Sequence, residues 1–152
     1  LVREGKPLLK ASKIKSSKVE QELSEEIMTP FAFVAIATLK AIPVVLVNGN
    51  TYYRVGDSAD GAGLSLVTRG TNKDSWSMES DVTVARIEGV VGNKLQIDGS
   101  GKLLKAMTSY SKPDLESLAQ KLGVPTSGVS RGVEKALTKP ELYQAVYAYV
   151  SL

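Results

Sequence analysis

Two apolar segments joined by Asn48-Gly49-Asn50 limit most strongly what this chain can form. The segments I-P-V-V-L-V (42–47) and T-Y-Y-R-V (51–55) are rich in β-branched and aromatic residues, which favour strands. Asn-Gly is the strongest short-range hairpin signal, because both residues tolerate the positive φ of a tight turn. The sequence therefore predicts a β-hairpin around which the rest of the chain has to fold.

Further short apolar segments follow the hairpin and are separated by glycine-containing turns. They predict strands at residues 64–68, 81–88, 94–97 and 102–107. Short strands with frequent turns are typical of a small antiparallel sheet or barrel. Together with the helices described next, they predict an α+β fold.

A helical pattern precedes the hairpin. Val19, Leu23 and Ile27 lie four residues apart with glutamates between them, which predicts a short amphipathic helix over 18–28. Thr29-Pro30 ends it, because the residue before a proline avoids helical angles.

The most apolar stretch of the chain, 28–47, has the length of a membrane span, but Pro30, Lys40 and Pro43 interrupt it. We therefore expect no membrane span here. The stretch predicts a buried helix at 31–39, followed by the first strand of the hairpin.

The last third of the chain predicts two helices with clear boundaries. S-K-P-D at 111–114 and T-K-P-E at 138–141 are capping-box starts, each followed by apolar residues at helical spacing. Gly123 ends the first of these helices.

Residues 111–150 resemble the SAP, LEM and HeH group of modules, in which two short helices joined by a stretched loop form a miniature core. The resemblance rests on D-L-E-S-L-A-Q-K-L-G-V-P, T-S-G and T-K-P-E-L-Y-Q-A-V. Connection 126–137 is longer than in those families, and the second helix is rich in tyrosine and poor in charge. The resemblance implies contact with nucleic acid or with another protein. The basic residues available for nucleic acid are Lys112, Lys121, Arg131, Lys135 and Lys139.

Three tyrosines lie in the last helix. Tyr149 shares the apolar stripe, so we expect it in the core, whereas Tyr143 and Tyr147 lie off the stripe. Tyrosine provides a large contact area at modest entropy cost, so Tyr143 and Tyr147 are the candidate protein-interface residues.

Charge is unevenly distributed along the chain: the net charge is +5 over 1–18, −5 over 19–101 and +3 over 102–152. A lysine-rich terminus is either a polyanion-binding arm or a solvated tail. We expect residues 1–18 to form a flexible basic arm, 19–108 an α+β domain, and 109–152 the helical module. Because the chain starts at Leu1, we expect it to be a processed or shortened form.

The chain contains no histidine and no cysteine, which excludes Ser-His-Asp and Cys-His catalysis and cysteine-based zinc sites. The loop 56–63 lacks the ligand spacing of an EF-hand, and 98–102 lacks the first glycine and the Ser or Thr of a phosphate-binding loop. We therefore expect a protein that is not an enzyme, with no cofactor and no metal.

Three functional hypotheses remain open. In the first, the two basic ends bind DNA or RNA through sequence-independent phosphate contacts. In the second, the chain is a structural subunit of a larger assembly, such as a virion or an organellar complex, and docks through its arm and its tyrosine-rich helix. In the third, a carboxylate enzyme uses groups of the sheet.

Overall fold

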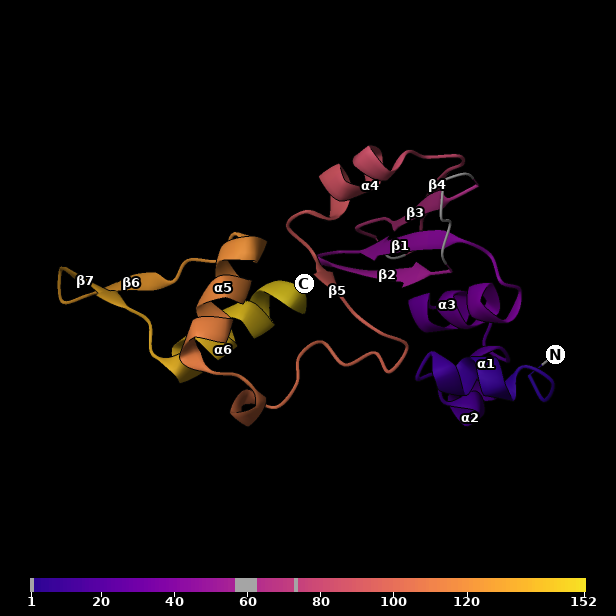
Figure 1. The fold of residues 1–152 in the computed structure, drawn as a ribbon, viewed down its shortest axis with the longest axis horizontal. Coiled ribbons are helices and arrows are strands. Elements are labelled where there is room, and N and C mark those ends of the chain that lie inside the picture. The colour runs from indigo at the N-terminus through magenta and orange to yellow at the C-terminus, as the bar shows by residue number, and fades with distance from the viewer. Residues whose placement is uncertain (1, 57–62, 73) are drawn as a thin grey trace.

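The computed structural model describes residues 2–56, 63–72 and 74–152 and shows an α+β fold (Figure 1). The helices of these ranges are α1 (Lys6–Ala11), α2 (Ser16–Glu22), α3 (Pro30–Leu39), α4 (Val84–Val91), α5 (Lys112–Leu122) and α6 (Lys139–Val150), with a 3-10 turn η1 (Met107–Ser109). The strands are β1 (Val44–Asn48), β2 (Thr51–Val55), β3 (Ser65–Arg69), β4 (Trp76–Glu79), β5 (Leu95–Gln96), β6 (Ser127–Ser130) and β7 (Val133–Ala136). Within these ranges, no helix has the length and apolar character that crossing a membrane requires.

Five strands form one mixed sheet in the order β4-β3-β1-β2-β5. β1 is antiparallel to β2 but parallel to β3, and β2 is parallel to β5. This corrects the expected antiparallel sheet or barrel. Local turn signals identify the hairpin, but they do not reveal that β3 pairs with β1 rather than with β2, the strand before it.

The predicted β1–β2 hairpin is confirmed, with a shifted turn. Asn48 pairs with Thr51, so the loop consists of Gly49 and Asn50. Only Gly49 has a positive φ, 61°, which is the type II′ pattern, whereas a type I′ Asn-Gly turn needs positive φ at both positions. The glycine thus occupies the first loop position rather than the second.

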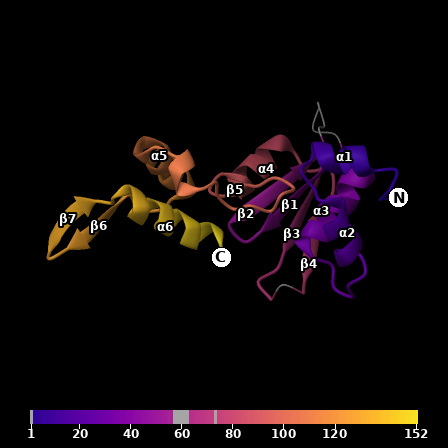
Figure 2. The same ribbon diagram turned by 90° about the horizontal axis from the view of Figure 1, so that it is seen from below.

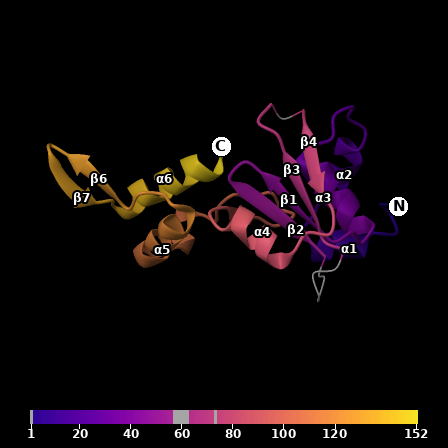
Figure 3. The ribbon, with the colours of Figure 1, turned by 90° about the horizontal axis from the view of Figure 1, so that it is seen from above.

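Helices cover both faces of the sheet, as Figures 1 and 3 show. Val44 and Leu46 pack into the cluster with the helices α1, α2 and α3, whereas Val45 and Val47 pack with α4. All four side chains are buried. A strand covered on both faces needs apolar residues at every position, which explains the unbroken V-V-L-V run.

The expected flexible arm is wrong for residues 6–18, which form α1 and the start of α2. Leu9, Ile14 and Val19 are buried in the same cluster as α3. Their spacing of five does not fit one helix, but it fits two short helices joined by a turn at Lys13, whose φ is 59°. The burial of these three side chains explains why the segment is ordered.

The predicted helix over 18–28 is shorter than expected, because α2 ends at Glu22. Leu23 and Ile27 are exposed, so this part of the apolar stripe finds nothing to pack against. The predicted helix over 31–39 is confirmed as α3, which Thr29 caps by accepting a hydrogen bond from the Ala32 amide at 3.1 Å.

The predicted strand at 81–88 is wrong, because this segment forms α4. Thr83 caps the helix by accepting the Arg86 amide at 3.2 Å, and the buried Ile87 faces the sheet with Val91 four residues later. β4 is a strand that the sequence pattern did not indicate. Residues 102–106 are irregular, not a strand, while β5 is a shorter form of the predicted 94–97 strand.

Both predicted C-terminal helices are confirmed as α5 and α6. The Ser111–Asp114 capping box is formed, and Gly123 ends α5 with a φ of 75°. The connection between the helices is the antiparallel hairpin β6–β7 rather than a stretched loop. Its turn residues, Arg131 and Gly132, have φ of 52° and 76°, the positive pair that a type I′ turn requires.

The end of α6 is attached to the large sheet by hydrogen bonds. The Asn50 side-chain amide donates to the Tyr149 carbonyl at 2.9 Å, and the Tyr149 hydroxyl donates to the Asn93 carbonyl at 3.0 Å. The result is an elongated molecule with β6–β7 at one end and α1 and α2 at the other (Figures 1 and 2).

Candidate nucleic-acid interface

The segment expected to be a basic arm forms a cleft of about 520 Å³ on α1 and α2. No carboxylate of the described residues lines it, and its lining residues are Lys6, Lys10, Lys13, Ile14, Lys15, Ser16 and Ser17. The four lysines are exposed. We call this the lysine cleft.

Most of the positive charge in the lysine cleft is not neutralised by carboxylates of the described residues. Lys13 pairs with Asp98 at 3.0 Å, but within the described residues Lys6, Lys10 and Lys15 form no ion pair with a carboxylate. Lys6 and Lys10 are one helical turn apart, an arrangement in which like charges repel. A bound anion would remove this repulsion.

Asp98 is the carboxylate next to this cleft. The Ser100 hydroxyl, which donates to the carboxylate, is the main cause that lowers the pKa of Asp98, and the Lys13 ammonium adds to it. Asp98 therefore stays ionised at neutral pH and holds Lys13 at one border of the cleft.

The sequence contains a local signal for the lysine cleft. Lys6 and Lys10 have i, i+4 spacing, and the buried Leu9 and Ile14 stand between the basic residues. Apolar side chains inside a basic segment indicate that it packs against the body of the protein, which brings its charges together.

The five basic residues predicted in the C-terminal module do not form one patch. Lys112 pairs with Glu116 at 3.8 Å on α5, and Lys121 lies nine residues further along, on the opposite side of that helix. The pKa of Asp114 is lowered mainly by hydrogen bonds from Ser111 and also by the charge of Lys139. Lys112 and Lys139 thus each lie near a carboxylate of α5, Glu116 and Asp114 respectively.

Arg131 and Lys135 are the two predicted residues that lie on the β6–β7 hairpin. Arg131 is the first residue of the β6–β7 turn, and Lys135 lies on β7 opposite Gly128. Both side chains are exposed, and no ion pair with a carboxylate of the described chain involves either of them.

The predicted interface tyrosines differ in exposure. The Tyr143 hydroxyl donates to the Lys105 carbonyl at 2.8 Å, and its ring lies against Tyr110, with centroids 6.3 Å apart. Tyr143 is therefore half-buried and engaged within the protein. Tyr147 stacks on Tyr143 but remains 45% exposed. Tyr149, which was expected in the core, is partly buried and packs against the module core.

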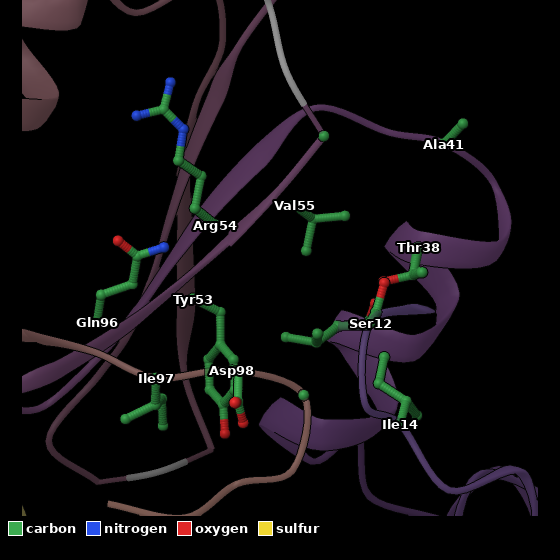
Figure 4. A pocket seen from close by; sticks show the side chains of 13 residues that line it. Ser12, Ile14, Thr38, Ala41, Tyr53, Arg54, Val55, Gln96, Ile97 and Asp98 are labelled. Atoms are coloured by element: carbon green, nitrogen blue, oxygen red, sulfur yellow. The ribbon is translucent and has the colours of Figure 1, made fainter. Parts of the chain in front are cut away.

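A second cavity, of about 620 Å³, lies between α3, β2 and the segment after β5 (Figure 4). Asp98 is its only carboxylate among the described residues, and Tyr53, Arg54 and Gln96 are its other larger polar side chains. Burial, followed by the charges of Asp98 and Glu22, raises the pKa of Tyr53. Tyr53 is therefore a hydrogen-bond donor at neutral pH rather than a base.

Among the described residues, carboxylates do not converge in this second cavity, although the enzyme hypothesis requires such convergence. The acidic residues Asp57 and Asp60 of the 56–63 loop lie outside the described residues. In the part of the chain that the structure describes, no three Asp or Glu side chains are grouped closely enough to hold a metal ion.

Comparison of the chain with protein-family models, with curated proteins and with solved structures finds no match.

Proposed function

We propose that this protein binds nucleic acid through phosphate contacts that do not depend on base sequence. The observation that carries the proposal is the lysine cleft, in which Lys6, Lys10 and Lys15 have no carboxylate partner among the described residues. Lysines that neutralise phosphates release condensed counterions, a favourable free-energy term that needs no reading of bases.

An extended polyanion fits the positions of these charges better than a small anion does. The lysine cleft is open and its lysines are exposed, whereas small ligands are usually enclosed by their sites. A second pair of exposed basic residues, Arg131 and Lys135, lies at the other end of the long axis (Figure 2). The two capped helices α5 and α6 resemble those of SAP-type modules, which supports the same class of ligand, whereas their β6–β7 connection differs from those modules.

The test is a titration of duplex DNA at several salt concentrations with the full chain and two charge-matched triple variants. Lys6→Gln, Lys10→Gln and Lys15→Gln should weaken binding and flatten the slope of log K against log salt by up to about 2.7, since each phosphate contact contributes about 0.9. The control variant changes three exposed lysines outside the cleft, Lys40, Lys102 and Lys105. It removes the same net charge and should keep most of the slope.

Two results would contradict the proposal. One is the absence of binding at low salt, where even weak phosphate contacts are strengthened. The other is an equal loss of affinity in both triple variants, which would mean that net charge rather than the lysine cleft attracts DNA.

The alternative function is a structural subunit of a larger assembly. Leu23, Ile27 and Met28 are exposed within a single short segment, and exposed apolar residues that lie close together mark contact surfaces. Tyr147 adds an exposed aromatic side chain. Light scattering over a range of protein concentrations tests this reading, because self-assembly that Leu23→Ser with Ile27→Ser abolishes would favour it.

A further inference from the structure

The β6–β7 hairpin exposes apolar side chains on both of its faces. Val129 is 76% exposed and Val133 is 56% exposed. Val129 lies opposite Glu134, and Val133 lies opposite Ser130, in the next residue pair along the ribbon. Successive pairs point to opposite faces, so the two valines lie on different sides. Neither belongs to the apolar cluster of α5 and α6.

Water is a poor environment for such a ribbon. A two-stranded hairpin on its own is marginally stable, and valine promotes strands chiefly by packing against neighbours. Neither valine packs into an apolar cluster of the described residues. A hairpin whose only role was to connect α5 and α6 would gain from polar residues at both positions.

The charges of the hairpin indicate an anionic partner. Arg131 occupies the turn, and Lys135 shares a face with Val133. The one carboxylate of the hairpin, Glu134, accepts a hydrogen bond from the Ser127 hydroxyl at 2.7 Å on the Val129 face. The turn and the Val133 face are therefore basic.

We propose that the β6–β7 hairpin enters the major groove of duplex DNA. Arg131 and Lys135 contact phosphates, while Val129 and Val133 contact the two sides of the groove. The inference rests on the proposed function and specifies its ligand as a duplex. The B-form major groove is wide enough for a two-stranded ribbon, whereas the major groove of A-form RNA is too narrow to be read by side chains.

The shape of the partner follows from which surfaces of the ribbon are apolar. A groove has two walls and covers both faces of an inserted ribbon, so it covers both valines. A flat protein surface covers one face and leaves the other valine exposed. Addition of a strand to the edge of the hairpin pairs backbone groups and leaves both faces open. Of these three partners, the groove is the one that covers both exposed valines.

The experiment compares the native full chain with the double variant Val129→Thr, Val133→Thr. The affinity of each protein is measured for a DNA duplex, for one of its single strands and for an RNA duplex of the same length. Threonine keeps the β-branched shape of valine, so the hairpin should still form. We expect roughly tenfold weaker binding to duplex DNA, from lost apolar contact. The salt slope and the single-strand affinity should stay unchanged. The RNA duplex should bind the native chain more weakly than DNA.

Two further variants serve as controls for this experiment. Ile27→Thr with Met78→Thr changes two exposed apolar residues elsewhere and should leave DNA binding unchanged. Arg131→Gln with Lys135→Gln should reduce the salt slope by about 1.8, the value for two lost phosphate contacts.

The outcomes separate this inference from the proposed function. Native affinity in the double threonine variant, together with lost binding in the lysine-cleft variant, would overturn the groove contact and leave the function standing. No duplex binding by the native chain would overturn both. A change of oligomeric state in the threonine variant would assign the valines to a protein contact and would also overturn the inference.

Discussion

Gly49 is part of the hairpin signal in the sequence and also contacts the C-terminal residues in the folded structure. Its φ of 61° is unfavourable for other residues. A Cβ atom at this position would also lie 2.6 Å from the Leu152 carbonyl oxygen. Both the turn and the packing of the C-terminal residues against it therefore require glycine.

Replacing Gly49 by alanine should destabilise the protein more than replacing Gly132, which has a φ of 76° but open space around it. Both variants carry the positive-φ cost of about 1–2 kcal/mol, and Gly49→Ala adds an overpacking cost of about 1–3 kcal/mol. Urea unfolding followed by circular dichroism measures the difference. Equal destabilisation would mean that Leu152 moves away without cost.

At the scale of elements, α1 belongs to the folded body, and this can be tested with two adjacent leucines. Leu9 is 1% exposed, whereas Leu8 is 52% exposed. Leu9→Ala should lower the free energy of unfolding by about 2–5 kcal/mol, because it leaves a cavity in the core. Leu8→Ala should change it by less than about 0.5 kcal/mol. If both variants lowered the free energy of unfolding by a similar small amount, residues 1–18 would instead be a flexible arm.

Elements with local start and stop signals were predictable from the sequence. The capping boxes at 111–114 and 138–141, Gly123 and the Asn48–Asn50 segment all act through near neighbours, and the elements they mark are present. α4 was mistaken for a strand because Val84, Ile87 and Val91 are good strand formers by composition. Their i, i+3, i+7 spacing and the Thr83 cap indicate a helix.

Features that depend on distant partners were not predictable. The parallel pairing of β1 with β3 joins the first strand of the hairpin to a strand that follows the hairpin, and it has no local signal. The basic residues of 1–18 were recognised, but their convergence in the lysine cleft depends on Leu9 and Ile14 reaching the core beneath α3. Arg131 and Lys135 could be named as candidates from composition. The hairpin that presents them could not be predicted.

At the scale of the whole molecule, the C-terminal module depends on its joint with the sheet. Tyr149→Phe removes the hydrogen bond to the Asn93 carbonyl and should cost the full chain about 1 kcal/mol of unfolding free energy. Tyr147→Phe is the control, because the Tyr147 hydroxyl has no hydrogen bond to the described residues, and it should have little effect. Urea unfolding of the two variants provides the comparison. Equal stabilities would show that the Tyr149–Asn93 hydrogen bond contributes nothing.

The Asn50–Tyr149 hydrogen bond joins residues 99 positions apart in the chain. During synthesis from the N-terminus, the hairpin turn that carries Asn50 leaves the ribosome long before Tyr149 is translated. Loop closure over such a separation also carries an entropic cost that a local turn avoids. The joint is therefore expected to form late, after the sheet and the two C-terminal helices have each begun to fold. A nascent chain that has not yet reached Tyr149 also lacks Leu152, and in it the Gly49 turn stays uncovered.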